Sequence, residues 1–162
     1  MEYLLFVDVQ PEFAKDMVGR KLYKRLLQFE QKVFPYYTVI APIYRNKGNI
    51  NMSRLVQWND MQEVSRPQFK AHYVYEHSGY SIREYPKFSS GDIVYVVGFD
   101  TDACVLSACF DLFDLDVNFK IIVDGCWSSG GKKMHQAGLE VMKRQFGKAV
   151  DTTTKLEDLY GR

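Results

Sequence analysis

Cys104 is the side chain in this sequence that is best placed to act as a nucleophile. It follows an apolar, β-branched run, Ile93–Val97, and the turn 98–102, and it falls in the first turn of a helix expected over Ala103–Leu115. At a helix N-terminus, unpaired backbone N–H groups and the positive end of the helix dipole favour an anion. We therefore expect the Cys104 thiol to lose its proton more easily than an ordinary cysteine.

The turn before this helix contains residues that would support such chemistry. Thr101 or Asp102 is expected to cap the helix, and Gly98 permits a tight turn that brings backbone N–H groups near the sulfur. These N–H groups would hold a developing oxyanion. The alternative is a buried structural cysteine, because free cysteine is among the most buried residue types. This stretch alone leaves both interpretations open.

Strand-like and helix-like segments alternate along the whole chain. Apolar or β-rich runs predict strands at Glu2–Val9, Tyr37–Tyr44, His72–Glu76, Ile93–Val97, Val117–Val123 and Ala149–Thr152, and helix-like patterns predict helices at Val18–Phe34, Ser53–Val64, Ala103–Leu115 and Lys132–Phe146. The alternation predicts an α/β protein: a three-layer α/β/α, Rossmann-like fold with a mostly parallel sheet of five or six strands. We expect the strand order 3-2-1-4-5-6 and one domain over residues 1–162.

Polar side chains occur where several of the expected strands end. Asp8 closes the first strand, His77 follows the third, Cys104 follows the fourth and Asp124 follows the fifth. Ligands of open parallel sheets bind beyond the carboxyl ends of the strands. The topology therefore predicts that these four side chains meet around one cleft.

The composition is typical of an ordinary soluble globular protein. Hydrophobic residues make up 46% and charged residues 25%, and the net charge is +1 with scattered Lys and Arg, so no nucleic-acid partner is expected. The run YLLFV near the start is too short for a signal peptide or a membrane span, so we expect a cytoplasmic protein without a membrane partner. An odd number of cysteines, at positions 104, 109 and 126, predicts free thiols.

Three segments resemble the isochorismatase-like cysteine hydrolases, the family of nicotinamidase, carbamoylsarcosine amidase and their relatives. They are LLFVDVQPEF, VVGFDTDACVLSACFDL, and IIVDGCWSSG followed by HQAGLEVMKRQFG, so the resemblance covers nearly the whole chain. It implies that Cys104 attacks a carbonyl and that Asp8 acts as acid and base. It also implies a cis peptide bond between Phe99 and Asp100, which aims the N–H groups of Asp100 and Cys104 at the oxyanion.

The sequence departs from this family pattern at two places. His77 stands where the family carries the lysine that completes its catalytic triad, and a histidine there is not necessarily charged at pH 7. The segment Arg45–Gln62 contains no His or Cys and only one acid, Asp60, where nicotinamidases carry metal ligands. We therefore expect no metal and no cofactor, and a substrate other than nicotinamide.

The resulting hypothesis is a hydrolase that cleaves the C–N bond of a small amide, ureido or carbamoyl compound through a Cys104 thioester. Asp8, Cys104 and His77 are the expected catalytic residues, and Phe13, Gln10 and Trp127 are candidates for contact with the substrate. Core packing explains Phe13 and Trp127 at least as well, and Gln10 would either orient Asp8 or face solvent. One alternative is a non-catalytic binding protein, disarmed by His77. Another is a redox-sensing thiol protein. The resemblance also implies a homo-oligomer, either a dimer or a tetramer.

Overall fold

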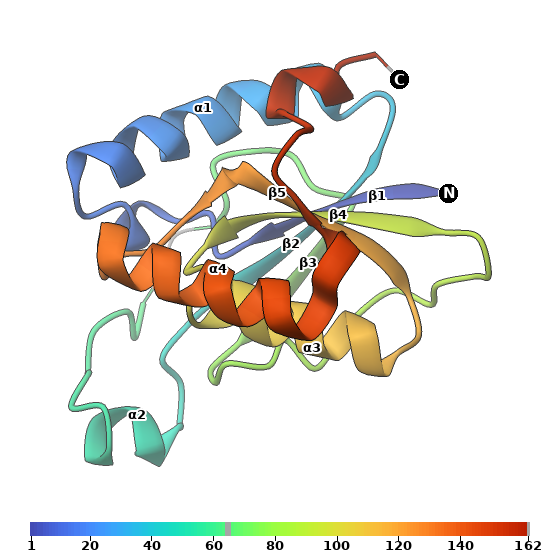
Figure 1. Cartoon of the computed structure of the whole chain (residues 1–162). Helices are drawn as coiled ribbons and strands as arrows, with labels where there is room; N and C mark the ends of the chain where they lie inside the picture. The colour runs from blue at the N-terminus through green and yellow to red at the C-terminus, as the bar shows by residue number, and fades with distance from the viewer. Residues whose placement is uncertain (64–65, 162) are drawn as a thin grey trace.

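A computed structural model describes residues 1–63 and 66–161 and contains a six-stranded parallel sheet (Figure 1). The strands are β1 (Glu2–Val7), β2 (Thr38–Tyr44), β3 (Tyr73–His77), β4 (Ile93–Phe99), β5 (Asn118–Trp127) and β6 (Val150–Asp151), and the α-helices are α1 (Met17–Val33), α2 (Ile50–Arg54), α3 (Cys104–Asp114) and α4 (Lys132–Phe146). The strand order is β3-β2-β1-β4-β5-β6, with every pair parallel. The predicted fold class and strand order are both confirmed.

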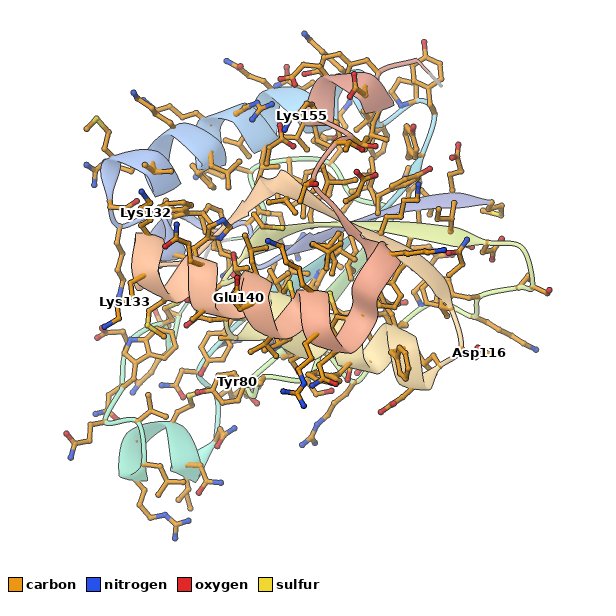
Figure 2. The ribbon with its side chains drawn as sticks, in the orientation of Figure 1. Tyr80, Asp116, Lys132, Lys133, Glu140 and Lys155 are labelled. Carbon is orange, nitrogen blue, oxygen red and sulfur yellow. The ribbon has the colours of Figure 1, made fainter. Side chains whose placement is uncertain are left out.

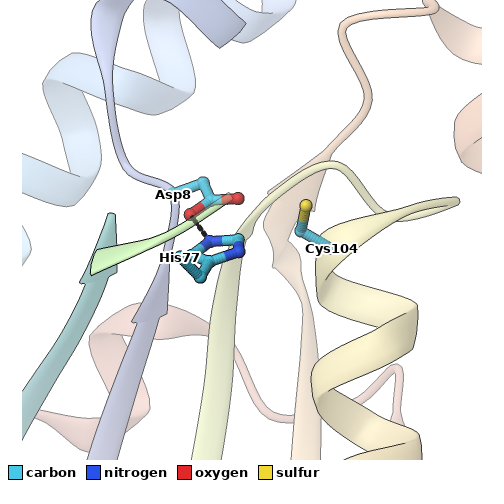
Figure 3. Close-up of side chains that lie close together, drawn as sticks. All are labelled: Asp8, His77 and Cys104. Carbon is cyan, nitrogen blue, oxygen red and sulfur yellow. Dashed lines mark hydrogen bonds and ion pairs between the residues drawn. The ribbon is translucent and has the colours of Figure 1, made fainter. Parts of the chain in front are cut away.

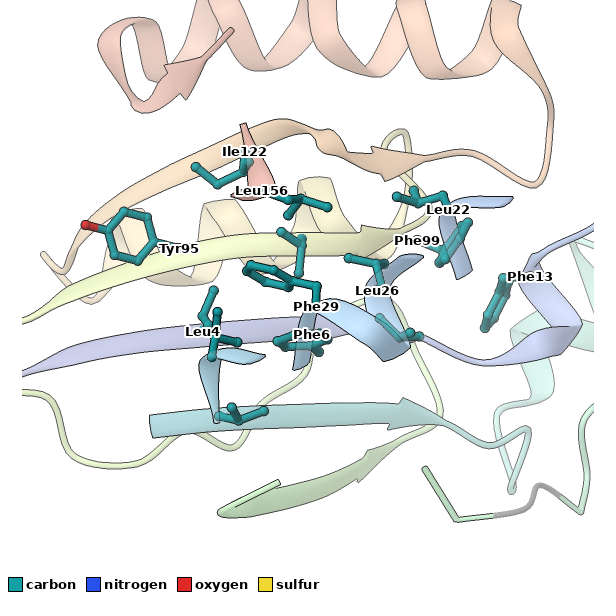
Figure 4. Packing of buried hydrophobic residues seen from close by; sticks show 14 of the residues in the cluster. Leu4, Phe6, Phe13, Leu22, Leu26, Phe29, Tyr95, Phe99, Ile122 and Leu156 are labelled. Carbon is teal, nitrogen blue, oxygen red and sulfur yellow. The ribbon is translucent and has the colours of Figure 1, made fainter. Parts of the chain in front are cut away.

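Alternate residues of the central strands build two separate cores, one on each face of the sheet. In β1, Leu4 and Phe6 face α1, whereas Leu5 and Val7 face the layer that contains α3 and α4. Figure 4 shows the first of these cores, where the α1 side chains pack on β1 and β4. A strand buried on both faces is apolar throughout, which explains the unbroken hydrophobic run at the start of the chain.

The three longer helices, α1, α3 and α4, cover the sheet with one apolar side each. In α4, His135, Gly138 and Met142 are buried, while Lys132, Lys133 and Glu140 lie on the exposed side (Figure 2). Two short 3-10 turns, Pro11–Phe13 and Gly147–Ala149, and a third at Leu156–Leu159 complete the secondary structure. Within the described part of the chain, no helix combines the length and apolar character that a membrane crossing requires.

The helix expected over Ser53–Val64 is wrong. The structure has a shorter helix, α2, which starts after Asn49, whose side chain accepts a hydrogen bond from the backbone of Asn51. Gln57 and Met61 both have positive φ angles, of 57° and 62°, which a right-handed helix does not allow. Val64 itself lies outside the described residues.

Asp124 does not lie at the cleft, because β5 is irregular. Val96 pairs with Ile121 and Gly98 with Cys126, so two steps along β4 correspond to five steps along β5. Asp124 falls in this irregular part and forms an ion pair with Arg25 of α1, with an Nη2–Oδ2 distance of 2.8 Å. The prediction that Asp124 joins the cleft residues is therefore wrong.

We expect replacement of Gly98 by alanine to destabilise the fold by about 3 kcal/mol or more. Gly98 has a φ of +126°, and an added Cβ would lie 2.0 Å from the carbonyl oxygen of Val7 in the neighbouring strand. Gly91→Ala is the matched control, since its φ is +90° but nothing lies within 4 Å of an added Cβ. Urea unfolding of both variants measures the difference, and equal losses would contradict the steric explanation.

Candidate active site

Three side chains from separate strand ends meet at the carboxyl edge of the sheet (Figure 3). Asp8 directly follows β1, His77 is the last residue of β3, and Cys104 is the first residue of α3. His77 Nε2 lies 2.6 Å from Asp8 Oδ1, and one potential ligand atom from each of the three residues lies within 4.8 Å of the others. The sequence-based prediction that these side chains lie together is therefore correct.

The hydrogen bonds of His77 indicate that it carries a positive charge. Its Nδ1 lies 2.8 Å from the carbonyl oxygen of Gly79, which can only accept, so Nδ1 holds a proton. Nε2 lies 2.6 Å from Asp8 Oδ1, and when this carboxylate is ionised it accepts a second N–H bond from the ring. Burial opposes the charged imidazole, but the charge and hydrogen bond of Asp8 outweigh it and raise the pKa of His77. A protonated His77 thus places a cation directly beside Asp8.

The environment of Cys104 differs from the one expected from the sequence. Burial first, and then the negative charge of Asp8, raise the pKa of the Cys104 thiol well above its usual range. The expectation that the helix N-terminus lowers this pKa is wrong, because the side chain is only 6% exposed and Asp100 and Asp102 add further negative charge. Any nucleophilic role of this thiol would require a partner that removes its proton.

Asp8 is placed to be that partner. Its side chain is fully buried, and only Oδ1 is used by His77. Oδ2 has no hydrogen-bond partner among the described residues, and in Figure 3 it lies on the side of Cys104. A buried carboxylate oxygen without a hydrogen bond raises the free energy of the folded protein. Its position next to a thiol would suit a group that accepts the thiol proton.

The turn before α3 is held by neighbouring elements. The Phe99–Asp100 peptide bond is cis, as the resemblance implies. Thr101 Oγ1 lies 2.7 Å from His135 Nδ1, and Asp102 accepts a hydrogen bond from Ser128. Neither side chain caps α3, so the capping prediction is wrong because both are already engaged elsewhere.

Asp100 links this turn to the loop that precedes α4. Its carboxylate accepts hydrogen bonds from the backbone and hydroxyl of Ser129, at 2.7 and 2.6 Å, and burial raises its pKa to about 6. The backbone N–H groups of Ala103 and Val105 both donate to the Asp100 carbonyl. The N–H groups of Asp100 and Cys104 take part in none of these bonds, and their role as an oxyanion hole stays a prediction.

A cavity of about 370 Å³ opens beside Cys104. Its lining combines aromatic, aliphatic and polar side chains with one cation: Phe13, Lys15, Tyr44, Met52, Val56, Gln57, Trp58, Tyr80, Asp100, Ala103, Cys104 and Ser129. Tyr44 stacks on Trp58 with ring centroids 5.2 Å apart, and Phe13 contacts both rings edge-on or tilted. Of these, Tyr44 carried a sequence signal that was missed, because it ends the second strand at the same edge as Asp8.

Two of the three predicted substrate-contact residues lie outside this cavity lining. Gln10 is buried and clamps the backbone of Tyr44, donating to its carbonyl at 3.0 Å and accepting from its N–H at 2.8 Å. Trp127 donates its indole N–H to Asp16, at 3.1 Å, and packs on His135. Both side chains therefore have protein partners away from this cavity, and their contact with a substrate stays a prediction; Phe13 does line the cavity.

The nicotinamidase type of metal site does not fit this chain. Asp60, the one acid between Arg45 and Gln62, is exposed and accepts a hydrogen bond from the indole of Trp58. Across residues 1–63 and 66–161, the one group of three side chains with metal-ligand spacing is Asp8, His77 and Cys104.

Several solved structures share this fold. The nicotinamidase PncA from Bacillus subtilis superposes with a TM-score of 0.69 at 15% identity, over 92% of this chain and 98% of that protein. N-carbamoylsarcosine amidase from Thermoplasma acidophilum gives 0.70 at 17% identity, over 93% and 95% of the two chains. An isochorismatase-like hydrolase from Alkaliphilus metalliredigens gives 0.71 at 16% identity, over 88% and 91%. At these identities the similarity concerns the fold alone.

Sequence comparison gives the family. No curated protein matches the sequence. The family model described as the isochorismatase domain matches residues 55–154. This match covers more than half of the chain and includes the segment with His77, the cis turn and Cys104. The chain therefore belongs to the isochorismatase family.

Proposed function

We propose that this protein is a cysteine hydrolase that cleaves the C–N bond of a small amide, ureido or carbamoyl compound. The observation that carries the proposal is the convergence of a thiol, a carboxylate and an imidazole, from Cys104, Asp8 and His77, with Cys104 also lining a cavity. A nucleophile, a base and a group that orients the base are the parts that acyl transfer through a covalent intermediate requires.

The reaction follows from the positions of these groups. Asp8 Oδ2 takes the proton of Cys104 as the sulfur attacks the substrate carbonyl, so no free thiolate has to exist beforehand. The N–H groups of Asp100 and Cys104 stabilise the oxyanion. Asp8 then protonates the leaving nitrogen. A water molecule, deprotonated by Asp8, attacks the thioester and releases the acid, and Asp8 returns that proton to the Cys104 sulfur. His77 stays protonated throughout and keeps the Asp8 carboxylate oriented.

The volume and the lining of the cavity restrict the size and chemistry of the substrate. A volume of about 370 Å³ suits a small molecule, and the rings of Phe13, Tyr44 and Trp58 favour a planar or apolar group next to the reacting carbonyl. Lys15 at the same cavity favours a negatively charged or strongly polar substituent. The names of the structural relatives, which include a nicotinamidase and an N-carbamoylsarcosine amidase, agree with C–N bond hydrolysis.

A substrate panel with two readouts tests the proposal. Primary amides, ureas and carbamoyl amino acids, with and without a carboxylate, are incubated with the protein while ammonia release is measured. Rapid acid quenching and intact-mass analysis of the same mixtures should show an acyl adduct on Cys104. Ammonia release that continues after Cys104 is fully alkylated would contradict the mechanism.

A non-catalytic binding protein is the second candidate, and the enclosure of Cys104 among carboxylates favours it. The rate of Cys104 alkylation by iodoacetamide between pH 5 and 10 separates the two candidates. Iodoacetamide is itself a small amide, so a working site should admit it and label Cys104 before the buried Cys109 and Cys126. Labelling of Cys104 no faster than of these two, in a protein that still binds a member of the panel, would favour the binding protein.

A further inference from the structure

The histidine at position 77 changes what the three converging side chains can bind. A lysine ammonium has three donors and no lone pair, whereas an imidazole that loses one proton offers a nitrogen ligand. Asp8, His77 and Cys104 together present an oxygen, a nitrogen and a sulfur, all buried. This is the mixed donor set that borderline-soft divalent cations such as Zn²⁺ take in proteins.

We propose that Asp8, His77 and Cys104 form a three-ligand site for a divalent cation of the Zn²⁺ type, and that an occupied site is catalytically silent. The inference rests on the proposed function, because the cation would use the same thiol and carboxylate that carry out hydrolysis. A bound cation would hold the Cys104 sulfur and the Asp8 carboxylate and so prevent attack on a substrate. The fourth coordination position would face the cavity beside Cys104.

The distances between the three ligand atoms require a small adjustment of the side chains. Zinc bonds of about 2.0 Å to nitrogen or oxygen and about 2.3 Å to sulfur place tetrahedral ligand atoms about 3.3 to 3.7 Å apart. His77 Nε2 and Asp8 Oδ1 are now 2.6 Å apart, and the three potential ligand atoms all lie within 4.8 Å of one another. Binding would therefore move Nε2 and Oδ1 apart and keep all three ligand atoms within the present limit of 4.8 Å.

Two further features point to a ligand at this position. Asp8 Oδ2 is buried without a hydrogen-bond partner among the described residues, so the carboxylate has coordination capacity to spare. The Nδ1–H of His77 points at the Gly79 carbonyl, which fixes the ring so that Nε2 faces Asp8. A backbone carbonyl behind a histidine is the usual outer support of a metal ligand.

Binding balances in charge and protons. The cation would displace the proton between Asp8 and His77 and the proton of the Cys104 thiol. Two protons leave to solvent, while the thiolate and the carboxylate together neutralise the two positive charges of the metal. No oxidant or reductant is needed, and a chelator reverses the step.

Cobalt is the probe that tests the proposal without any substrate. Co²⁺ added to the metal-free protein should bind with 1:1 stoichiometry and produce a thiolate-to-cobalt charge-transfer band together with the visible bands of tetrahedral cobalt. Cys104→Ser should remove the charge-transfer band, and His77→Gln should weaken Zn²⁺ binding in calorimetry by at least about 100-fold. The matched controls Cys109→Ala and His72→Gln, which alter residues outside the site, should bind as the unchanged protein does.

The outcomes separate this proposal from the proposed function. No 1:1 binding, or a cobalt spectrum unchanged by Cys104→Ser, would overturn the cation site whether or not the protein hydrolyses amides. A cobalt spectrum that depends on Cys104 would support the site even if every substrate fails. His77→Lys should lose Zn²⁺ binding, and any hydrolysis by this variant should no longer be inhibited by zinc.

Discussion

Replacing Cys104 by alanine is expected to abolish hydrolysis of any substrate found in the panel, with a fall in kcat of at least about a thousandfold. The sulfur is the proposed nucleophile of the first step. Without it, water would have to attack the substrate directly, with neither the covalent intermediate nor the proton transfer from the thiol to Asp8. Steady-state ammonia release measures the effect. A kcat within tenfold of the wild-type value would rule out the cysteine mechanism.

Two further variants separate chemistry from structure at this position. Cys104→Ser keeps the shape of the side chain but presents an oxygen that Asp8 deprotonates poorly, so we expect it to be nearly as inactive as the alanine variant. Cys109→Ala removes a buried thiol of the same helix that packs in the core below the sheet. It should lose about 1 to 2 kcal/mol of stability but keep kcat within about threefold.

The strands of the sheet could be predicted because the hydrophobic pattern that marks each of them lies within a short stretch of sequence. A buried parallel strand reads as an unbroken apolar run, and the residue that ends it is polar when it borders a ligand site. Asp8 and His77 were found in this way, and Cys104 from its place at the start of the following helix. The family resemblance added the cis turn before Cys104 and the expected roles.

The wrong predictions depend on contacts that no local pattern encodes. Asp124 was misplaced because the irregularity in β5 is defined only by its pairing with β4. The sequence likewise does not reveal that Tyr44 and Asp16 are the partners of Gln10 and Trp127. The pKa of Cys104 was predicted in the wrong direction. The local sequence shows that Cys104 starts a helix, but only the tertiary structure shows that it is buried among carboxylates.

His77 is the residue whose replacement most directly tests how this site works. We expect His77→Gln to lower kcat/KM by at least about 100-fold, because the amide can still donate a hydrogen bond to Asp8 but carries no charge. The buried Asp8 carboxylate would also lose its counter-ion, at a cost of about 3 to 5 kcal/mol in stability. Urea unfolding should accompany the kinetics, so that a folding defect is recognised.

His77→Lys is the matched variant that restores a permanent cation. The ammonium can donate to Asp8 and to the Gly79 carbonyl, so we expect activity within about tenfold of the unchanged protein. A lysine variant as inactive as the glutamine variant, although folded, would show that the imidazole ring itself, rather than its charge, is required.

The wild-type protein and the His77→Lys variant should differ in the alkaline part of their pH profiles. Because Asp8 raises the pKa of His77, the imidazolium–carboxylate pair is complete below about pH 6.5 and is lost as the pH rises through the pKa in the folded protein. The kcat/KM of the wild-type protein should therefore decline as the pH rises above the pKa of His77 in the folded protein. In His77→Lys the same limb should move towards the lysine range near about 10.4, since the ammonium stays charged. Superimposable alkaline limbs in profiles of kcat/KM from pH 5 to 10 would mean that His77 does not act as the cation of this site.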